Sequence, residues 1–416
     1  MTSVHPTDTW ADSPFPVKGA FSPFAELVHA PFERVQEGCP SYGDEQSGHV
    51  QKIDFEQAIN EIGERLTLDI PGFLALYVCS PQVKSPAPSL SLGLVTHHPL
   101  TPQTKRTLQV AIGRFLGIPR ISLGCWTPAN LRSELLKEKT GIEVLLGGTK
   151  ITGIQDPLAS IGVQFAKSPA PQAALTELQK AFEALLRFPP NGDSSDFDLT
   201  PSPQDFHPNI GPVLAIEHLT NAMLLKLGAY TSSLEERKEV LKKTYPVSPS
   251  RLKLLIWGLE GGYEDPPLDT TELSAGTSEA EALWHKLRHL CLGLYVSIRF
   301  PDAEMEIDSP KHPIFKEVTL PKSRLGRWWR KLREPRSVDL GLDPYGRLLL
   351  ALVLAKTAPD KENKQLCNKI ADILPNLGGG ILANPTWENL RKEAMVIHAV
   401  TQPNAPLGFR DFLSAI

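Results

Sequence analysis

The sequence predicts an α/β domain, with a short and largely parallel sheet and flanking helices, followed by a mainly α-helical domain. At 416 residues the chain is long enough for two domains with cores of their own. Short apolar runs alternate with helical patterns in residues 51–188, whereas capped helical patterns dominate residues 213–416. Residues 189–212 separate the two regions with six prolines and an acidic, Ser-rich patch, which predicts a linker.

Residues 1–50 are rich in Pro, Ser and Gly, and they also carry five aromatic residues in their first part: Trp10, Phe15, Phe21, Phe24 and Phe32. Proline-rich chain holds an extended backbone at low entropic cost, so this composition predicts an extended arm that packs over a domain. The first twenty residues lack a basic stretch followed by an apolar one, and we therefore expect no secretory signal.

The strands of the α/β domain are predicted from short apolar runs bounded by Pro, Ser or Gly. These runs are 73–79, 90–95, 121–125 and 142–146, and the last of them ends at Gly147-Gly148. The alternation of these runs with helices favours a parallel, doubly wound layer. The first two runs are an exception, because their short connection favours antiparallel pairing.

The helices of the α/β domain are predicted over 55–68, 101–116, from 127 to about 139, and 173–186. Thr101 is expected to cap the second helix, with Pro102 in its first turn. In the helical domain, Ser233 with Glu236 and Ser278 with Glu281 have the spacing of a capping box. Further helices are expected to start at 248–249 and to cover 347–355, 364–374 and 385–398.

We expect an intracellular, cytoplasmic protein of bacterial type with reduced thiols. The five cysteines are odd in number and widely scattered, which fits neither a disulfide framework nor a zinc module. The longest apolar run, 348–355, is far shorter than the roughly 20 residues that span a bilayer, so no transmembrane segment is expected. The net charge of −4 gives the whole molecule no attraction for nucleic acid, and any such binding must be local.

The strongest local signal is the basic segment, residues 311–336, with nine Lys or Arg against two Glu. A helix between Ser323 and Pro335 would place Leu325, Trp328, Trp329 and Leu332 on one apolar stripe. Cations would cover its remaining surface, and this pattern suits phosphate groups. The predicted polyanion-binding residues are Arg324, Arg327, Trp328, Trp329, Arg330, Lys331 and Arg333.

A second basic strip, residues 237–253, carries six cations against one Glu and is a possible further contact. Its cations are Arg237, Lys238, Lys242, Lys243, Arg251 and Lys253. Seven acidic residues and no basic one lie in residues 260–281, a stretch that could dock a basic protein partner. Alternatively, the blocks of opposite charge neutralise one another and the tryptophan stripe belongs to the core, or exposed tryptophans seat the helix at a membrane interface.

An enzyme is the alternative class, with a pocket at the edge of the sheet. His97 and His98 directly follow a strand, and Cys125 and Gly147-Gly148 would leave their strands at the same edge of a parallel sheet. His97 or His98 would then act as general acid or base beside Cys125. The chain contains no GxSxG, HExxH or CxxC motif. These patterns do not decide whether the protein is an enzyme, but they favour a non-catalytic protein. They identify no cofactor.

His285 and His289 lie one helical turn apart, which is the spacing of a shared metal. Lys286 stands where such sites usually carry a Glu, so we expect a surface or packing pair and no metal. Taken together, the patterns predict an intracellular, non-catalytic protein that binds a polyanion, with nucleic acid and DNA as the leading candidates, within a larger assembly. A protein-interaction scaffold is the remaining alternative.

Overall fold

A computed structural model describes residues 55–79, 89–118, 120–189, 210–244, 248–262, 265–268, 278–302, 307, 312–317, 342–358, 361–380, 382 and 385–401. The described chain forms two compact units. The first holds the described residues up to Gly162 except Leu136–Lys139, and the second holds Leu136–Lys139 and the described residues from Val163 onward. The N-terminal arm lies outside the described residues.

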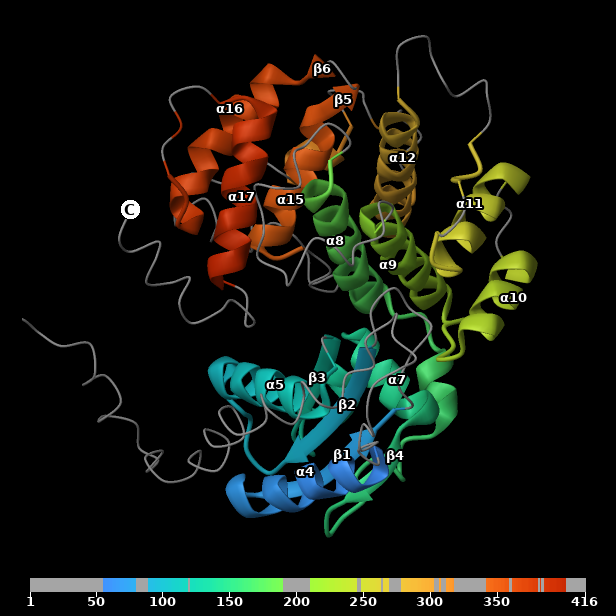
Figure 1. Ribbon diagram of the computed structural model, residues 1–416, viewed down its shortest axis with the longest axis vertical. Coiled ribbons are helices and arrows are strands. Elements are labelled where there is room, and N and C mark those ends of the chain that lie inside the picture. Colours follow the sequence, from blue (N-terminus) through green and yellow to red (C-terminus); the bar gives the residue numbers. More distant parts are fainter. Residues whose placement is uncertain are drawn as a thin grey trace, which may run out of the picture. The chain divides into compact units, whose positions relative to one another are not determined.

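The first unit is built on a four-stranded sheet of order β3-β2-β1-β4 (Figure 1). β1 pairs antiparallel with both β2 and β4, as the short connection predicts for β1 and β2, whereas β2 and β3 are parallel. The α/β class is therefore confirmed, but the sheet is mixed rather than largely parallel. The strands are β1 (Phe73–Val78), β2 (Ser89–Thr96), β3 (Arg120–Trp126) and β4 (Thr149–Thr152).

Helices cover both faces of this sheet. α4 (Phe55–Asp69) and α5 (Pro102–Leu116) share one core with the leucine face of β2, where Leu92 and Leu94 are fully buried. α7 (Lys139–Gly147) lies against the opposite face, because a side chain at Gly93 would meet Val144 at about 3 Å. Successive side chains of a strand point to opposite faces of the sheet. Because helices cover both faces, every residue of β1 is buried.

Two expectations for this unit are wrong. Residues 142–146 belong to helix α7 and not to a strand. Residues 140–145 are all buried, the polar Glu143 included, so their side chains do not alternate between core and solvent with a helical period. The sequence from Thr127 starts with a turn, in which the Thr127 N–H donates to Asn130 Oδ1 at 2.7 Å. The helix there, α6 (Leu131–Leu135), is short. The remaining helices of this unit match the expected ranges within two residues.

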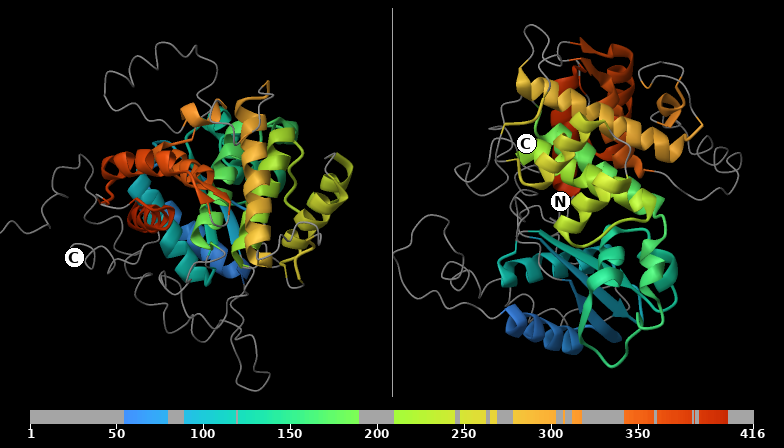
Figure 2. Two further views of the ribbon diagram at one scale, coloured as in Figure 1. Left: turned by 90° about the horizontal axis from the view of Figure 1, so that it is seen from above. Right: turned by 90° about the vertical axis from the view of Figure 1, so that its right-hand side faces the viewer.

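The second unit is mainly helical, as predicted, with α8 packed against α9, α12 and α15 (Figure 2). α8 belongs to this unit. α9 begins at Ile210, so the structure describes only residue 189 and residues 210–212 of the expected linker, 189–212. Its elements are η1 (Val163–Lys167), α8 (Pro171–Arg187), α9 (Ile210–Leu227), α10 (Leu234–Thr244), α11 (Pro249–Leu259), α12 (Glu279–Arg299), α13 (Ile314–Glu317), α15 (Pro344–Ala355), β5 (Lys356–Ala358), β6 (Lys361–Glu362), α16 (Lys364–Ile373), η5 (Leu374–Leu377) and α17 (Trp387–Thr401).

Of the two predicted capping boxes, that of α12 has both of its hydrogen bonds, whereas at α10 the structure shows the bond to Ser233 Oγ. The Ser278 hydroxyl accepts from the Glu281 N–H at 3.3 Å, and the Glu281 carboxylate accepts from the Ser278 N–H at 3.0 Å, which completes the capping box of α12. Thr101 caps α5 by accepting from the N–H of Thr104 at 3.1 Å. Ser233 accepts from the Glu236 N–H at 3.5 Å at the start of α10. These side chains fix where the helices begin.

Candidate anion-binding surfaces

The basic segment is described only at residues 312–317, which include the short helix α13. His312 is buried there, its Nδ1 accepts from the Ile314 N–H at 3.1 Å, and its ring packs against Phe300 at the end of α12. Burial lowers the pKa of His312. The described start of the basic segment is therefore packed within the second unit through His312. Its predicted contact residues, Arg324, Arg327, Trp328, Trp329, Arg330, Lys331 and Arg333, lie outside the described residues.

Four cations of the second basic strip are exposed on two helices that pack together. They are Lys242 and Lys243 near the end of α10, and Arg251 and Lys253 on α11. Lys242 pairs with Glu239 at 2.9 Å, but both side chains are about half exposed, and such surface pairs add little stability. The four side chains can therefore meet an anionic partner.

The other two cations of this strip make contacts within the second unit. Arg237 is only 2% exposed, donates from Nη1 to Asn221 Oδ1 at 2.9 Å, and lies over the Tyr230 ring. Lys238 pairs with Glu235 at 3.3 Å and with Glu260 at 3.1 Å. The expectation that Arg237 contacts a polyanion is corrected by its burial.

Arg237 belongs to a buried polar network that joins α8, α9 and α10. Its partner Asn221 donates to Glu177 Oε2 at 3.4 Å, and His218 Nδ1 lies 2.9 Å from the same oxygen. Lys180 Nζ lies 2.6 Å from Glu177 Oε1. Burial raises the pKa of Glu177, but the charges of Lys180 and His218 outweigh it and hold that pKa well below its ordinary value. No pattern in the sequence links Glu177 to His218, which lie 41 residues apart.

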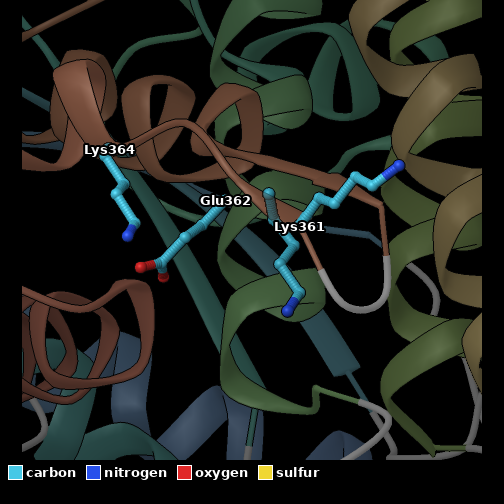
Figure 3. Close-up of a pocket in the computed structure, with 4 residues that line it drawn as sticks. Lys361, Glu362 and Lys364 are labelled. Atoms are coloured by element: carbon cyan, nitrogen blue, oxygen red, sulfur yellow. The ribbon is translucent and has the colours of Figure 1, made fainter.

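A cavity of about 370 Å³ lies beside the β5–β6 hairpin (Figure 3). Its lining residues are Lys356 on β5, Lys361 and Glu362 on β6, and Lys364 at the start of α16. Lys361 and Lys364 are exposed, whereas Lys356 and Glu362 are half-buried. No sequence pattern indicated this lysine pocket, because its residues follow no helical or strand period.

Two contacts with the start of α17 hold one side of the lysine pocket. Glu362 Oε2 accepts from the Trp387 N–H at 2.8 Å, which satisfies one of the unpaired N–H groups at a helix N-terminus. Lys356 Nζ lies 5.2 Å from the centroid of the Trp387 ring, within the range of a cation–π contact. The Trp387 indole N–H in turn donates to Leu352 O at 2.8 Å. The hairpin, α15 and α17 are thereby joined.

The residues proposed for an enzyme pocket come together only in part. His97 and His98 are exposed at the end of β2, which lies beside the end of the parallel strand β3. Cys125 on β3 packs against the core shared with α4 and α5. Gly147-Gly148 precedes β4, whose first residues pair with the far end of β1. The glycines therefore lie at the opposite edge of the sheet from His97, contrary to the expectation.

His285 and His289 differ in their surroundings. His289 is exposed, whereas the Nε2 atom of His285 is buried and has no hydrogen-bond partner among the described residues. Burial, together with the charges of Arg288, His289 and Lys356, lowers the pKa of His285 to about 4, so this ring is neutral near pH 7. Among the residues that the structure describes, no group of three or more His, Cys, Asp or Glu side chains is arranged to hold a metal ion.

The acidic stretch is described only in part. Glu260 pairs with Lys238, and Glu281 closes the capping box of α12, so both serve contacts within the second unit. Glu264, Asp269 and Glu272 lie outside the described residues. Whether the stretch binds a protein partner stays a prediction.

Comparison of the chain with protein-family models, with curated proteins and with solved structures finds no match. None of the helices in the described ranges is both long enough and apolar enough to cross a membrane. Cys79, Cys125, Cys291 and Cys367 form no disulfide with one another.

Proposed function

We propose that this protein is a non-catalytic polyanion-binding protein of the cytoplasm, and that nucleic acid is its partner within a larger assembly. The observation that carries the proposal is the basic segment, where nine Lys or Arg stand against two Glu in a chain with a net charge of −4. A local excess of this size attracts phosphates even though the whole molecule is acidic. Arg side chains in the segment suit phosphate groups, because the N–H donors of a guanidinium can bind two oxygens of one phosphate.

The exposed cations of α10 and α11 support a second contact in the same unit. Lys242, Lys243, Arg251 and Lys253 stand on neighbouring helices with their side chains exposed. Contacts of this kind go to the phosphate backbone and carry no sequence information. The proposal therefore expects binding that depends strongly on salt and weakly on base sequence. The odd number and wide spacing of the five cysteines support the cytoplasm as the location.

The test is a titration of the full chain against labelled single- and double-stranded DNA and RNA at several salt concentrations. One variant carries Arg327→Glu, Arg330→Glu and Lys331→Glu, and a second carries Lys242→Glu, Lys243→Glu and Arg251→Glu. The control carries three charge reversals at scattered, exposed sites, Arg132→Glu, Lys167→Glu and Lys369→Glu, so that all three variants have the same net charge.

We expect the first variant to bind least and the second to bind with intermediate affinity. Removal of one phosphate contact should reduce the slope of log K against log salt by about 0.7–0.9. The control should keep the slope of the unmodified protein, with an affinity lowered only by the change in net charge. Absence of binding at low salt, or equal weakening of binding in all three folded variants, would overturn the proposal.

A further inference from the structure

We propose that the lysine pocket at the β5–β6 hairpin binds the diphosphate group of a small molecule, with Lys356, Lys361 and Lys364 as its cationic donors. This site differs from the basic segment, and it does not depend on the polyanion proposal. Its lining residues are three lysines and one glutamate, so the excess charge is two positive units. A diphosphate carries two or more negative charges near pH 7 and is a suitable counterpart.

The glutamate does not cancel the attraction of the lysines for an anion. Glu362 is bound through Oε2 to the Trp387 N–H at the N-terminus of α17, where the helix dipole is positive. A carboxylate is stabilised at that end of a helix, so the capping contact accounts for its place in the wall of the pocket. Three lysines stand against this one carboxylate among the lining residues, so the net charge of the pocket stays positive.

The lysine pocket combines a fixed side with two adaptable donors. Lys356 is half-buried over the Trp387 ring, and this ring makes an edge contact with Trp284 at 6.0 Å between centroids. Lys361 and Lys364 are exposed, and neither forms an ion pair with another residue of the described chain. Figure 3 shows the side chains of Lys364 and Glu362 extending toward each other. The two exposed lysines can therefore turn toward an incoming anion.

The volume of the cavity suits a small ligand. Its volume of about 370 Å³ falls at the lower end of the range for small-molecule sites. A lysine ammonium is a compact point charge with three donors, which suits the spread oxygens of phosphoryl groups. Inorganic diphosphate and a nucleoside diphosphate such as ADP share this chemistry, and experiment can separate them.

The test measures heats of binding to the full chain for inorganic diphosphate, ADP and AMP at low ionic strength. A variant with Lys361→Gln and Lys364→Gln removes the two adaptable donors. The matched control, Lys167→Gln with Lys369→Gln, removes two exposed lysines that do not line the pocket, one of them on the same helix α16. Acetylation of lysines, read by mass spectrometry with and without diphosphate, locates the site independently of affinity.

We expect diphosphate to bind the unmodified protein and the control equally, and to bind the pocket variant at least about tenfold more weakly. Diphosphate should also protect Lys361 and Lys364 from acetylation but not Lys369. ADP binding as tightly as diphosphate, with AMP weaker, would identify a nucleoside diphosphate as the natural form. Diphosphate alone binding would identify the inorganic ion.

Equal affinity in the pocket variant and the control, or no heat of binding at low ionic strength, would overturn the inference. The Arg327→Glu, Arg330→Glu, Lys331→Glu variant separates the two proposals. It should lose nucleic acid and keep diphosphate, whereas the pocket variant should do the reverse.

Discussion

At the scale of single residues, the second unit buries three arginines and supplies each with at least one hydrogen-bond acceptor. Arg237, Arg288 and Arg391 are each at most 2% exposed. Arg288 Nε donates to Val353 O at 2.8 Å, and Arg391 Nη1 donates to Leu186 O at 2.9 Å. An arginine stays charged in any environment, so only such acceptors make its burial tolerable. These arginines serve packing and are not available to an anionic partner.

Glu177 provides a test of the buried network. Its pKa lies below the ordinary value of 4.5 in the folded protein, so the folded state binds fewer protons than the unfolded state. Its contribution to stability is therefore complete above the unfolded pKa and is lost as the pH falls. We expect Glu177→Gln to lower the free energy of unfolding by about 2 kcal/mol at pH 7, since the partner Lys180 is half exposed and can be solvated.

Urea unfolding of both proteins at pH 7, 5.5 and 4 measures this effect. The difference in the free energy of unfolding should shrink between pH 5.5 and 4. Glu239→Gln is the control, because Glu239 pairs with Lys242 on the exposed surface and its loss should leave stability unchanged within error. A difference that stays constant with pH would show that the Glu177 carboxylate contributes through packing alone.

The burial of Arg237 shows what the sequence could not predict at this scale. This residue lies between Glu236 and Lys238 in a charged run that is typical of a solvated helix face. Its burial is decided by Asn221 and Tyr230, which come from other parts of the chain. Charge counts along the sequence could not distinguish cations that face solvent from cations that hold helices together.

At the scale of elements, side chains from α12 and α17 satisfy the carbonyl groups at the ends of other helices. The Trp284 indole N–H donates to Leu185 O at 2.8 Å, and Arg391 donates to Leu186 O, both near the end of α8. The Trp387 indole N–H donates to Leu352 O in α15. The last carbonyls of a helix lack partners within it. Buried donors at these positions fix how α8, α12, α15 and α17 pack.

The capping box of α12 gives a prediction for a single element. Both of its reciprocal hydrogen bonds are present, so Ser278→Ala should lower the free energy of unfolding by about 1 kcal/mol. Ser248 at the start of α11 is the matched control, because its side chain makes no capping hydrogen bond. Ser248→Ala should change stability by a few tenths of that amount. Thermal and urea unfolding check both, and equal effects would show that the box does not stabilise α12.

Caps were predictable because they rest on residues three positions apart, and the predicted starts of α5, α10 and α12 are confirmed. α7 was not predictable in the same way. Its residues 140–145 are all buried, and a short apolar run reads equally well as a buried strand. Once α7 is a helix, Gly147-Gly148 must lead into β4. This change removes the glycines from the edge where His97 and His98 lie.

At the scale of the whole molecule, periodicity predicted the fold class, an α/β part followed by a mainly helical part, whereas it predicted the candidate site only as charge. The basic segment stands out in composition, but its contact residues lie outside the described part of the chain. The lysine pocket needs the turn between β5 and β6 to bring Lys356 and Lys361 together. Three lysines at irregular spacing follow no helical or strand period, so the sequence does not predict that they lie together.

The two units also predict how the molecule responds to loss of core packing. Leu76 on β1 and Leu287 on α12 are both fully buried, one in each unit. Either change to Ala removes a similar volume, and we expect a loss of about 2–5 kcal/mol of stability in the unit concerned. If each unit has a core of its own, Leu76→Ala should speed amide hydrogen exchange in β1–β3 while α8, α9 and α12 stay protected, and Leu287→Ala should do the opposite. Hydrogen exchange read by mass spectrometry on the full chain separates these patterns. A loss of protection spread over both units by either substitution would show that the two cores unfold as one.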